Sequence, residues 1–514
     1  MSSKKKTMIN VICSVMVLAT NVVISFFLSP YIVKHIGVEA NGFVTLANNF
    51  VSYAGLIVMA LNSMAARYIT ILYVQKDYKK ANMYYNSVFW GNLIIVALLI
   101  LPATYFIVRM ETLVDIPHNI VLDVKLLFSF VFFNFFLTTG FPNWDCGVYV
   151  TNRLDRQYIP QMGTAILRCI IIFTTLTIWT PHVWYVGMAA SIMTVINLAV
   201  NGYNTHSLTP KLKISLPPKK IICTKKAVFE LVGNGVWNSI SSVGNMLLSG
   251  LDLIICNVTL GATAMGIVSL SKILPNYMQQ LSSSIRSAFA PELTINFAKG
   301  DKEALLKDLS RAMKLTSIVM TIPIAIIVVL GDRFFALWVP SQDASLLQKL
   351  SILAILGYMF TSGTQILFNV FTTVNKVREN AVAMLISGVA STTITLILAK
   401  YTNYGIFAVA GVSTFVNLAR NMSFTVPATA KYLGFKWYQF FPQVGTTVLS
   451  SVVIVGIGFV VKHFLAGGTW LNFIIASFVI GALGLVFNIY IVLNKDERNF
   501  LYGKVIHRFK RKKS

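Results

Sequence analysis

Charged residues are scarce in this sequence, since Asp, Glu, Lys and Arg make up only 12% of its 514 residues. Soluble domains carry about a quarter, so the composition excludes an ordinary soluble globular protein. Hydrophobic residues make up 56%, and apolar runs of about 20 residues, long enough to cross a bilayer as helices, recur along the chain. Fourteen such runs begin near residues 7, 40, 84, 122, 158, 182, 228, 262, 312, 347, 381, 404, 443 and 471.

The motifs of catalysis and cofactor binding are also missing. The five cysteines show no CxxC spacing, and the six histidines form no HExxH motif, so neither a disulfide framework nor a metal site is indicated. The sequence has no GxxxxGK[ST] phosphate-binding loop, which excludes a nucleotide-driven motor within this chain. We therefore expect neither an enzyme nor a cofactor.

Acidic residues are few, and the net charge is +25. With the N-terminus inside, seven Lys and Arg fall in outer loops and two, Arg168 and Lys272, fall inside apolar runs, while the rest lie in cytoplasmic segments. This asymmetry follows the positive-inside rule and predicts a multi-pass plasma-membrane protein with both termini cytoplasmic. We expect the basic tail at 504–513 to contact anionic lipid headgroups rather than nucleic acid.

The two halves of the chain repeat each other. The segment 36–46 (IGVEANGFVTL) matches 260–270 (LGATAMGIVSL) at an offset of 224, and 194–199 (TVINLA) matches 414–419 (TFVNLA). Because six spans precede the second copy, both copies enter the membrane in the same orientation, as in parallel-repeat transporters. The fold class is therefore all-α and polytopic, with about 14 transmembrane helices arranged as two pseudo-symmetric six-helix lobes plus two C-terminal helices.

These patterns divide the chain into five parts. The predicted parts are an N-terminal lobe at 1–204 (spans 1–6), a cytoplasmic linker at 205–226, a C-terminal lobe at 227–435 (spans 7–12), spans 13 and 14 at 436–494, and a basic cytoplasmic tail at 495–514.

Several spans carry polar side chains at steps of three and four, which place them on one helix face. The members of these stripes that we expect to line a cavity are Asn48, Asn238, Asn245, Asn276 and Gln279; Asn234 begins the stripe of the seventh span and Asp252 ends it. The alternative role is hydrogen bonding between packed helices, which such residues also serve. Two adjacent spans with five or six polar groups each favour a water-filled cavity.

Two basic residues lie inside the spans. A charge at a helix centre costs about 2.5–3.5 kcal/mol on insertion scales and is usually functional, so Arg168 and Lys272 are the candidate substrate contacts. Snorkelling or an ion pair that locks two helices is the alternative role for either residue. Asp252 is a candidate for binding a coupling cation, and Pro275 is expected to kink or hinge the eighth span.

The balance of charge within the spans predicts the cargo. A cavity with cations and almost no carboxylates has a positive potential and favours an anion. Guanidinium matches phosphate oxygens in a bidentate manner, so a phosphate or pyrophosphate group fits best.

The chain resembles the Wzx-like polysaccharide flippase family of the multidrug, oligosaccharidyl-lipid and polysaccharide exporter superfamily. The matching residues are the block 28–37 (LSPYIVKHIG) with Gly42, the run 65–69 (AARYI), and the second copy at 260–261 with Gly266. The resemblance covers nearly the whole chain. It implies a MATE-like fold, in which two six-helix lobes form a V around a central cavity and expose it alternately to the two sides.

The resemblance further implies the cargo and its partners. It implies that an undecaprenyl-pyrophosphate-linked oligosaccharide, an O-antigen or capsular repeat unit, moves from the inner to the outer leaflet of a bacterial plasma (inner) membrane. The lipid tail would ride in a groove near spans 13 and 14, and partners would include a glycan polymerase and glycosyltransferases. The alternatives are a cation-coupled multidrug exporter, a flippase for the lipid-linked peptidoglycan precursor, and a non-transporting scaffold that recruits glycosyltransferases.

Overall fold

The computed structural model describes residues 3–62, 65–141, 146–151, 153–215, 236–298, 302–465, 467–495 and 497–499. Over these ranges the regular secondary structure is entirely helical. Eleven helices in them are long and apolar enough to cross a membrane, which confirms an all-α multi-pass membrane protein. The three other expected spans coincide with α1, with the pair α12–α13, and with α19–α20, which the residue ranges below locate.

The helices separate into two compact units. Unit 1 comprises Met1–Met246 together with Leu253–Ser269, and unit 2 comprises Leu247–Asp252 together with Leu270–Ser514. The helices of unit 1 are α1 (Ser3–His35), α2 (Val38–Asn62), α3 (Ala65–Val74), α4 (Tyr78–Val108), α5 (Met110–Leu113), η1 (His118–Ile120), α6 (Val121–Gly140), α7 (Cys146–Val150), α8 (Asp155–Ile178) and α9 (Trp184–Leu208).

The seventh span and the first part of the eighth cross the boundary between the units. They hold the helical segment from Val236, the π-helical turn η3 (Met246–Gly250), α11 (Asp252–Leu260) and α12 (Ala262–Ser271). The sequence places the whole of 227–435 in the second lobe, whereas residues 253–269 pack within unit 1. Half of the predicted linker, 216–226, and most of the predicted tail lie outside the described residues.

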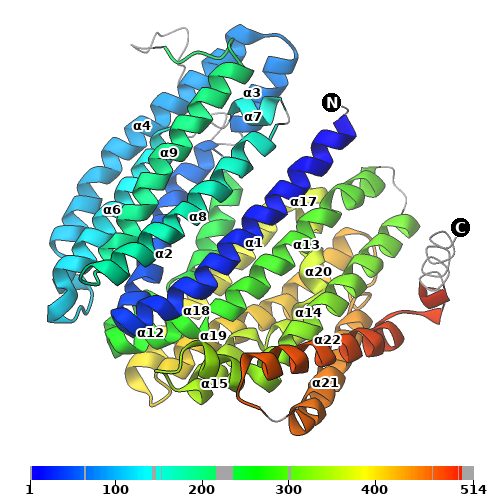
Figure 1. Cartoon of the computed structure of the whole chain (residues 1–514). Helices are drawn as coiled ribbons and strands as arrows, with labels where there is room; N and C mark the ends of the chain where they lie inside the picture. The colour runs from blue at the N-terminus through cyan, green and yellow to red at the C-terminus, as the bar shows by residue number, and fades with distance from the viewer. Residues whose placement is uncertain are drawn as a thin grey trace, which may run out of the picture. The chain divides into compact units, whose positions relative to one another are not determined.

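Unit 2 is built around one long helix, α14 (Lys302–Trp338), which packs against α13, α15, α21 and α22 (Figure 1). The helices of this unit are α13 (Ile273–Ala298), α14, α15 (Ala344–Ile355), α16 (Tyr358–Thr361), η4 (Gly363–Leu367), α17 (Phe368–Thr373), α18 (Val377–Tyr401), α19 (Ile406–Arg420), the π-helical turn η5 (Asn421–Thr425), α20 (Val426–Tyr432), α21 (Phe441–Phe464) and α22 (Trp470–Val492).

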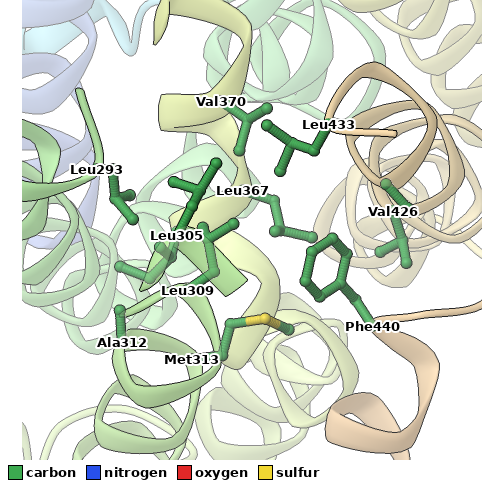
Figure 2. Packing of buried hydrophobic residues seen from close by; sticks show 12 residues of the cluster. Leu293, Leu305, Leu309, Ala312, Met313, Leu367, Val370, Val426, Leu433 and Phe440 are labelled. Atoms are coloured by element: carbon green, nitrogen blue, oxygen red, sulfur yellow. The ribbon is translucent and has the colours of Figure 1, made fainter. Parts of the chain in front are cut away.

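A hydrophobic cluster packs α14 against neighbouring segments of unit 2 (Figure 2). It joins Leu309 and Met313 of α14 to Leu367 of η4, Val426 of α20 and Phe440 just before α21. All five side chains are nearly or fully buried. Burial of this many apolar groups from four separate segments fixes the ends of these spans relative to one another.

The repeated segments meet each other within unit 1. A Cβ added to Gly42 would lie 3.0 Å from the Cα of Gly266, and a Cβ added to Gly266 would lie 2.5 Å from the carbonyl oxygen of Val38. Glu39 accepts a 2.8 Å hydrogen bond from the hydroxyl of Thr263. Gly42 and Gly266, like Glu39 and Thr263, are 224 residues apart, so equivalent positions of the repeat touch. Such self-matched contacts arise where two copies pack about a local two-fold axis.

Asparagine side chains hold the start of the chain that follows α9. Asn86, which is fully buried, donates to the carbonyl of Lys213 at 2.9 Å and accepts from the N–H of Ser215 at 2.7 Å. Asn82, one turn earlier on α4, bonds Lys211 and Lys213 in the same way. The spacing of four residues aligns the two amides along α4. Each amide both donates to and accepts from the backbone of the segment 211–215, as a neighbouring β-strand would.

Candidate functional site

Arg168 lies in the second half of α8, a helix that packs against α1 and α9 in unit 1. Its side chain is half-buried, and its Nε is shielded from solvent with no hydrogen-bond partner among the described residues. None of the ion pairs formed by the described residues involves Arg168. The guanidinium is therefore a positive charge that the described part of the chain leaves uncompensated, as the sequence predicts.

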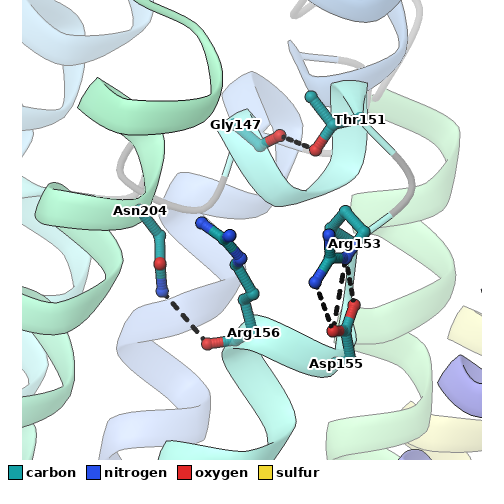
Figure 3. Close-up of polar contacts among 6 residues, drawn as sticks. All are labelled: Gly147, Thr151, Arg153, Asp155, Arg156 and Asn204. Atoms are coloured by element: carbon teal, nitrogen blue, oxygen red, sulfur yellow. Dashed lines mark hydrogen bonds and ion pairs between the residues drawn. The ribbon is translucent and has the colours of Figure 1, made fainter.

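The start of α8 is fixed by polar contacts (Figure 3). Arg153 donates two hydrogen bonds of 2.9 Å, from Nε and Nη2, to the carboxylate of Asp155. The amide of Asn204 in α9 donates to the carbonyl of Arg156 at 3.1 Å. These contacts anchor the helix that carries Arg168.

Thr164, on the predicted polar face of α8, serves helix packing. Asn197 of α9 donates to its hydroxyl at 2.8 Å, and that hydroxyl donates in turn to the carbonyl of Pro160. Asn41 likewise donates to Ser269 at 3.1 Å, and both residues are buried. For these residues the structure supports interhelical hydrogen bonding.

Lys272 and Asp252, predicted in separate roles, form an ion pair in unit 2. The side chain of Asp252 is 4% exposed and that of Lys272 is 15% exposed. The sequence predicts Lys272 as a free cation that contacts cargo, and it does not account for this partner. The ammonium is neutralised where it lies, which is the helix-locking alternative considered for it.

Pro275 interrupts the eighth span close to the ion pair. Helix α12 ends at Ser271 and α13 begins at Ile273, so the break falls at Lys272. Proline lacks the N–H that would bond the carbonyl four residues earlier, here that of Ser271. The hydroxyl of Ser351 in α15 donates to this carbonyl at 2.7 Å instead. The carbonyl that the helix break leaves free is therefore hydrogen-bonded by a neighbouring helix. The role of Pro275 as a hinge stays a prediction.

The other predicted cavity residues are mostly open to their surroundings. Asn48, Asn245, Asn276 and Gln279 are exposed, and Asn238 is half-buried. The amide of Asn48 donates to the carbonyl of Val44 on its own helix at 2.9 Å. The cavity role of these residues stays a prediction. The beginning of the stripe, Asn234, lies outside the described residues.

Two further arginines lie within helical spans. They are Arg286 in α13 and Arg420 at the end of α19, and the charge count from the sequence places both in cytoplasmic segments. Arg420 is 7% exposed, because the helix does not stop there: it continues through η5 and α20 to Tyr432.

The described ranges hold no group of three or more His, Cys, Asp or Glu side chains able to bind a metal ion. Three guanidinium groups on helical spans, those of Arg168, Arg286 and Arg420, have no carboxylate partner among the described residues, whereas Asp252 and Lys272 form a buried ion pair.

Comparisons with solved structures identify the fold. A structure of the lipid II flippase MurJ in an inward closed conformation matches with a TM-score of 0.64 at 15% identity, covering 93% of this chain and 98% of that one. The eukaryotic MATE transporter AtDTX14 matches with a TM-score of 0.59 at 14% identity, covering 87% and 99%. A multidrug resistance MATE family transporter of the MOP superfamily, in an inward-facing conformation, gives 0.58 at 13% identity over 81% and 94%.

The fold is MATE-like. Sequence relatives add less, because no protein-family model matches the chain. The chain is 26% identical over 504 residues to the "Uncharacterized membrane protein EpsK" of Bacillus subtilis (strain 168), and the match covers 96% of each protein. A MATE-like fold of full length places the predicted site residues on a scaffold shared with a flippase and with multidrug transporters.

Proposed function

We propose that this chain is a flippase that moves a lipid-linked oligosaccharide with a diphosphate headgroup from the cytoplasmic to the outer leaflet by alternating access. The cargo class is the undecaprenyl-pyrophosphate-linked repeat unit of an O-antigen or capsule. Both termini face the cytoplasm of a bacterial inner membrane in this proposal. A glycan polymerase and glycosyltransferases are the proposed partners.

The observation that carries the proposal is the uncompensated guanidinium of Arg168. Its Nε has no partner among the described residues, and those residues supply no carboxylate to it. Removing a cation from water without a counterion is costly, so a site that retains one gains from an anionic ligand. Arginine offers a planar fork of donors that fits two phosphate oxygens at once. The fold that this chain shares with MurJ, a lipid II flippase by its printed name, supports the same class of cargo.

An apolar groove in unit 2 suits the lipid portion of such a cargo. It has a volume of about 250 Å³, and its walls include Leu274 and Leu281 of α13, Ile326 of α14 and Phe473 of α22. The resemblance implies a lipid groove near spans 13 and 14, and Phe473 belongs to the fourteenth. An isoprenoid chain would gain free energy by burying apolar surface against these side chains.

The proposal is tested in cells by replacing Arg168 with Gln and with Lys. We expect Arg168→Gln to reach the membrane at normal levels, to lose surface glycan, and to accumulate lipid-linked intermediates inside. Arg168→Lys retains the charge but not the bidentate geometry, so it should restore export only in part. Arg109→Gln is the matched control, because Arg109 is exposed at the end of α4.

Full export of glycan by Arg168→Gln would remove the proposed role of this residue. Normal glycan in cells that lack the chain altogether would instead remove the proposed function and leave the scaffold or exporter alternatives.

A second candidate, a cation-coupled multidrug exporter, is favoured by the buried carboxylate of Asp252. Exporters of this kind tend to use membrane carboxylates, and Asp252 exchanging Lys272 for a proton or metal cation would supply one. Expression in a drug-sensitive strain tests this candidate. Raised resistance that Asp252→Asn abolishes would support it, whereas unchanged sensitivity would exclude it.

A further inference from the structure

Two arginines share one aromatic ring inside unit 2. The guanidinium carbon of Arg420, at the end of α19, lies 5.2 Å from the centroid of the Phe368 ring, and that of Arg286, in α13, lies 5.8 Å from the same centroid. Both distances are within the range of a cation–π contact. The three residues come from the eighth, tenth and twelfth spans, so the fold, and not a local sequence motif, brings them together.

The charges of this cluster have only neutral partners. Arg420 donates from Nη2 to Asn417 Oδ1 at 2.7 Å and from Nη1 to the sulfur of Met384 at 2.8 Å. Its Nε is buried with no partner in the described part of the chain. Arg286 makes one weak side-chain hydrogen bond among the described residues, 3.5 Å from Nη2 to the hydroxyl of Ser283. Two like charges around one ring repel each other, and a buried charge without a counterion is unfavourable.

Further polar atoms in the turn that follows Arg420 also lack partners among the described residues. The Oδ1 of Asn421 and the hydroxyl of Thr425 are both shielded from solvent and unbonded, although both residues are fully buried. Asn421 and Thr425 are the ends of the π-helical turn η5. Single π-helical turns inside α-helices occur frequently at functional sites.

The surrounding core holds the cluster rigidly. Leu367 and Val426, which adjoin Phe368 and Thr425 in the sequence, belong to the hydrophobic cluster of unit 2 shown in Figure 2. Ile285 and Met422, next to Arg286 and Asn421, pack against that cluster. The amide of Asn369 donates to the carbonyl of Arg286 at 2.8 Å and ties α17 to α13. A preorganised pair of guanidinium groups binds an anion without the cost of ordering the side chains.

We propose that Arg286, Phe368 and Arg420 form an anion site that binds a phosphate or diphosphate group. Each guanidinium supplies charge-assisted hydrogen bonds to phosphate oxygens, and an anion held by both relieves their mutual repulsion. The site lies toward the predicted cytoplasmic ends of its spans, whereas the Asp252–Lys272 pair lies toward the outer ends. The anion comes from one of two sources, the diphosphate of the proposed cargo or the headgroup of an anionic phospholipid; the first source rests on the proposed function.

The test measures binding to the full-length protein purified in a neutral detergent. The probes are farnesyl diphosphate, farnesol and dioleoyl phosphatidylglycerol, titrated by microscale thermophoresis. We expect farnesyl diphosphate to bind far more tightly than farnesol, which lacks the anion. Arg420→Gln and Arg286→Gln should each weaken diphosphate binding by about tenfold or more, the scale of one charge-assisted contact.

Two variants control this measurement. Arg311→Gln removes an exposed arginine from α14 in the same unit and should bind as the unchanged protein does. Arg420→Lys keeps the positive charge but replaces the planar guanidinium by an ammonium group, so it should give an intermediate affinity for farnesyl diphosphate. If Arg420→Gln does not fold, Arg286→Gln and Arg420→Lys carry the test.

The outcomes separate the sources and the hypotheses. Arginine-dependent binding of the diphosphate alone supports the site with the cargo as its source. Equal, arginine-dependent binding of phosphatidylglycerol supports the site with a phospholipid as its source. Diphosphate binding that Arg286→Gln and Arg420→Gln leave unchanged overturns the site while the proposed function stands. Absence of binding by any phosphate-bearing probe overturns the site as well, and the cellular test of Arg168 then decides the function separately.

Discussion

Removing one member of the Asp252–Lys272 pair should destabilise the protein far more than removing both. Lys272→Met leaves the Asp252 carboxylate, whose side chain is 4% exposed, without its partner. Breaking a buried ion pair in this way costs about 3–5 kcal/mol, because one charge stays buried and uncompensated. Replacing both partners by neutral groups of similar size is often nearly neutral.

The expected magnitude follows from these two cases. We expect Lys272→Met to lower the free energy of unfolding by about 3 kcal/mol or more. The double variant Asp252→Asn/Lys272→Met should recover at least about 2 kcal/mol of that loss, since Asn keeps the shape of the carboxylate without its charge. Recovery on adding a second mutation is the signature of direct coupling between the two side chains.

The assay is equilibrium unfolding in mixed micelles, in which an anionic denaturing detergent is titrated into dodecyl maltoside and tryptophan fluorescence is followed. The four proteins of the cycle are measured under the same conditions. A double variant that is no more stable than Lys272→Met would refute the reasoning, because the two side chains would then contribute independently.

Three further predictions concern packing and the chain that follows α9. Gly266→Val should destabilise unit 1 by about 1–3 kcal/mol, because its Cβ would lie 2.5 Å from the carbonyl oxygen of Val38. The monodisperse fraction on size-exclusion chromatography should fall accordingly. Gly55→Val is the control and should behave as the unchanged protein does, because nothing lies within 4 Å of its Cβ. Asn86→Ala removes the bonds to Lys213 and Ser215, each worth about 1 kcal/mol, so trypsin should cleave at Lys211 and Lys213 several-fold faster. An unchanged cleavage rate would show that these bonds do not hold the segment. Asn257→Ala removes two hydrogen bonds, of 2.8 and 2.9 Å, to the backbone of Asp115 and should lower the midpoint of unfolding. Asn48→Ala is the control and should leave that midpoint unchanged, because the Asn48 amide bonds a carbonyl of its own helix.

The architecture could be predicted from the sequence because it depends on composition and periodicity. Apolar runs of sufficient length must be helical in a bilayer, and the match between 36–46 and 260–270 predicted a duplicated fold. The boundary of the second lobe differs, since residues 253–269 pack within unit 1. Within unit 1 this segment contacts Gly42 through Gly266, Glu39 through Thr263 and Asp115 through Asn257, and no local sequence pattern reveals these partners.

The partners of charged side chains could not be predicted in the same way. Spacing places Lys272 and Asp252 on particular helix faces, but it does not say which neighbouring helix each face meets. Asp252 is 20 residues from Lys272 and lies on another span. The charge count from the sequence places Arg420 in a cytoplasmic segment. The helix that continues to Tyr432 buries it instead.

The most direct test of the central claim is translocation by the purified protein in sealed vesicles. Polyprenyl-diphosphate-linked oligosaccharide is placed in both leaflets, and a membrane-impermeant glycosidase or lectin reports the fraction that reaches the outside over time. We predict that vesicles containing the protein expose the protected half of the cargo, and that Arg168→Gln slows this exposure strongly. Equal rates in protein-containing and empty vesicles, or equal rates for Arg168→Gln and the unchanged protein, would contradict the account.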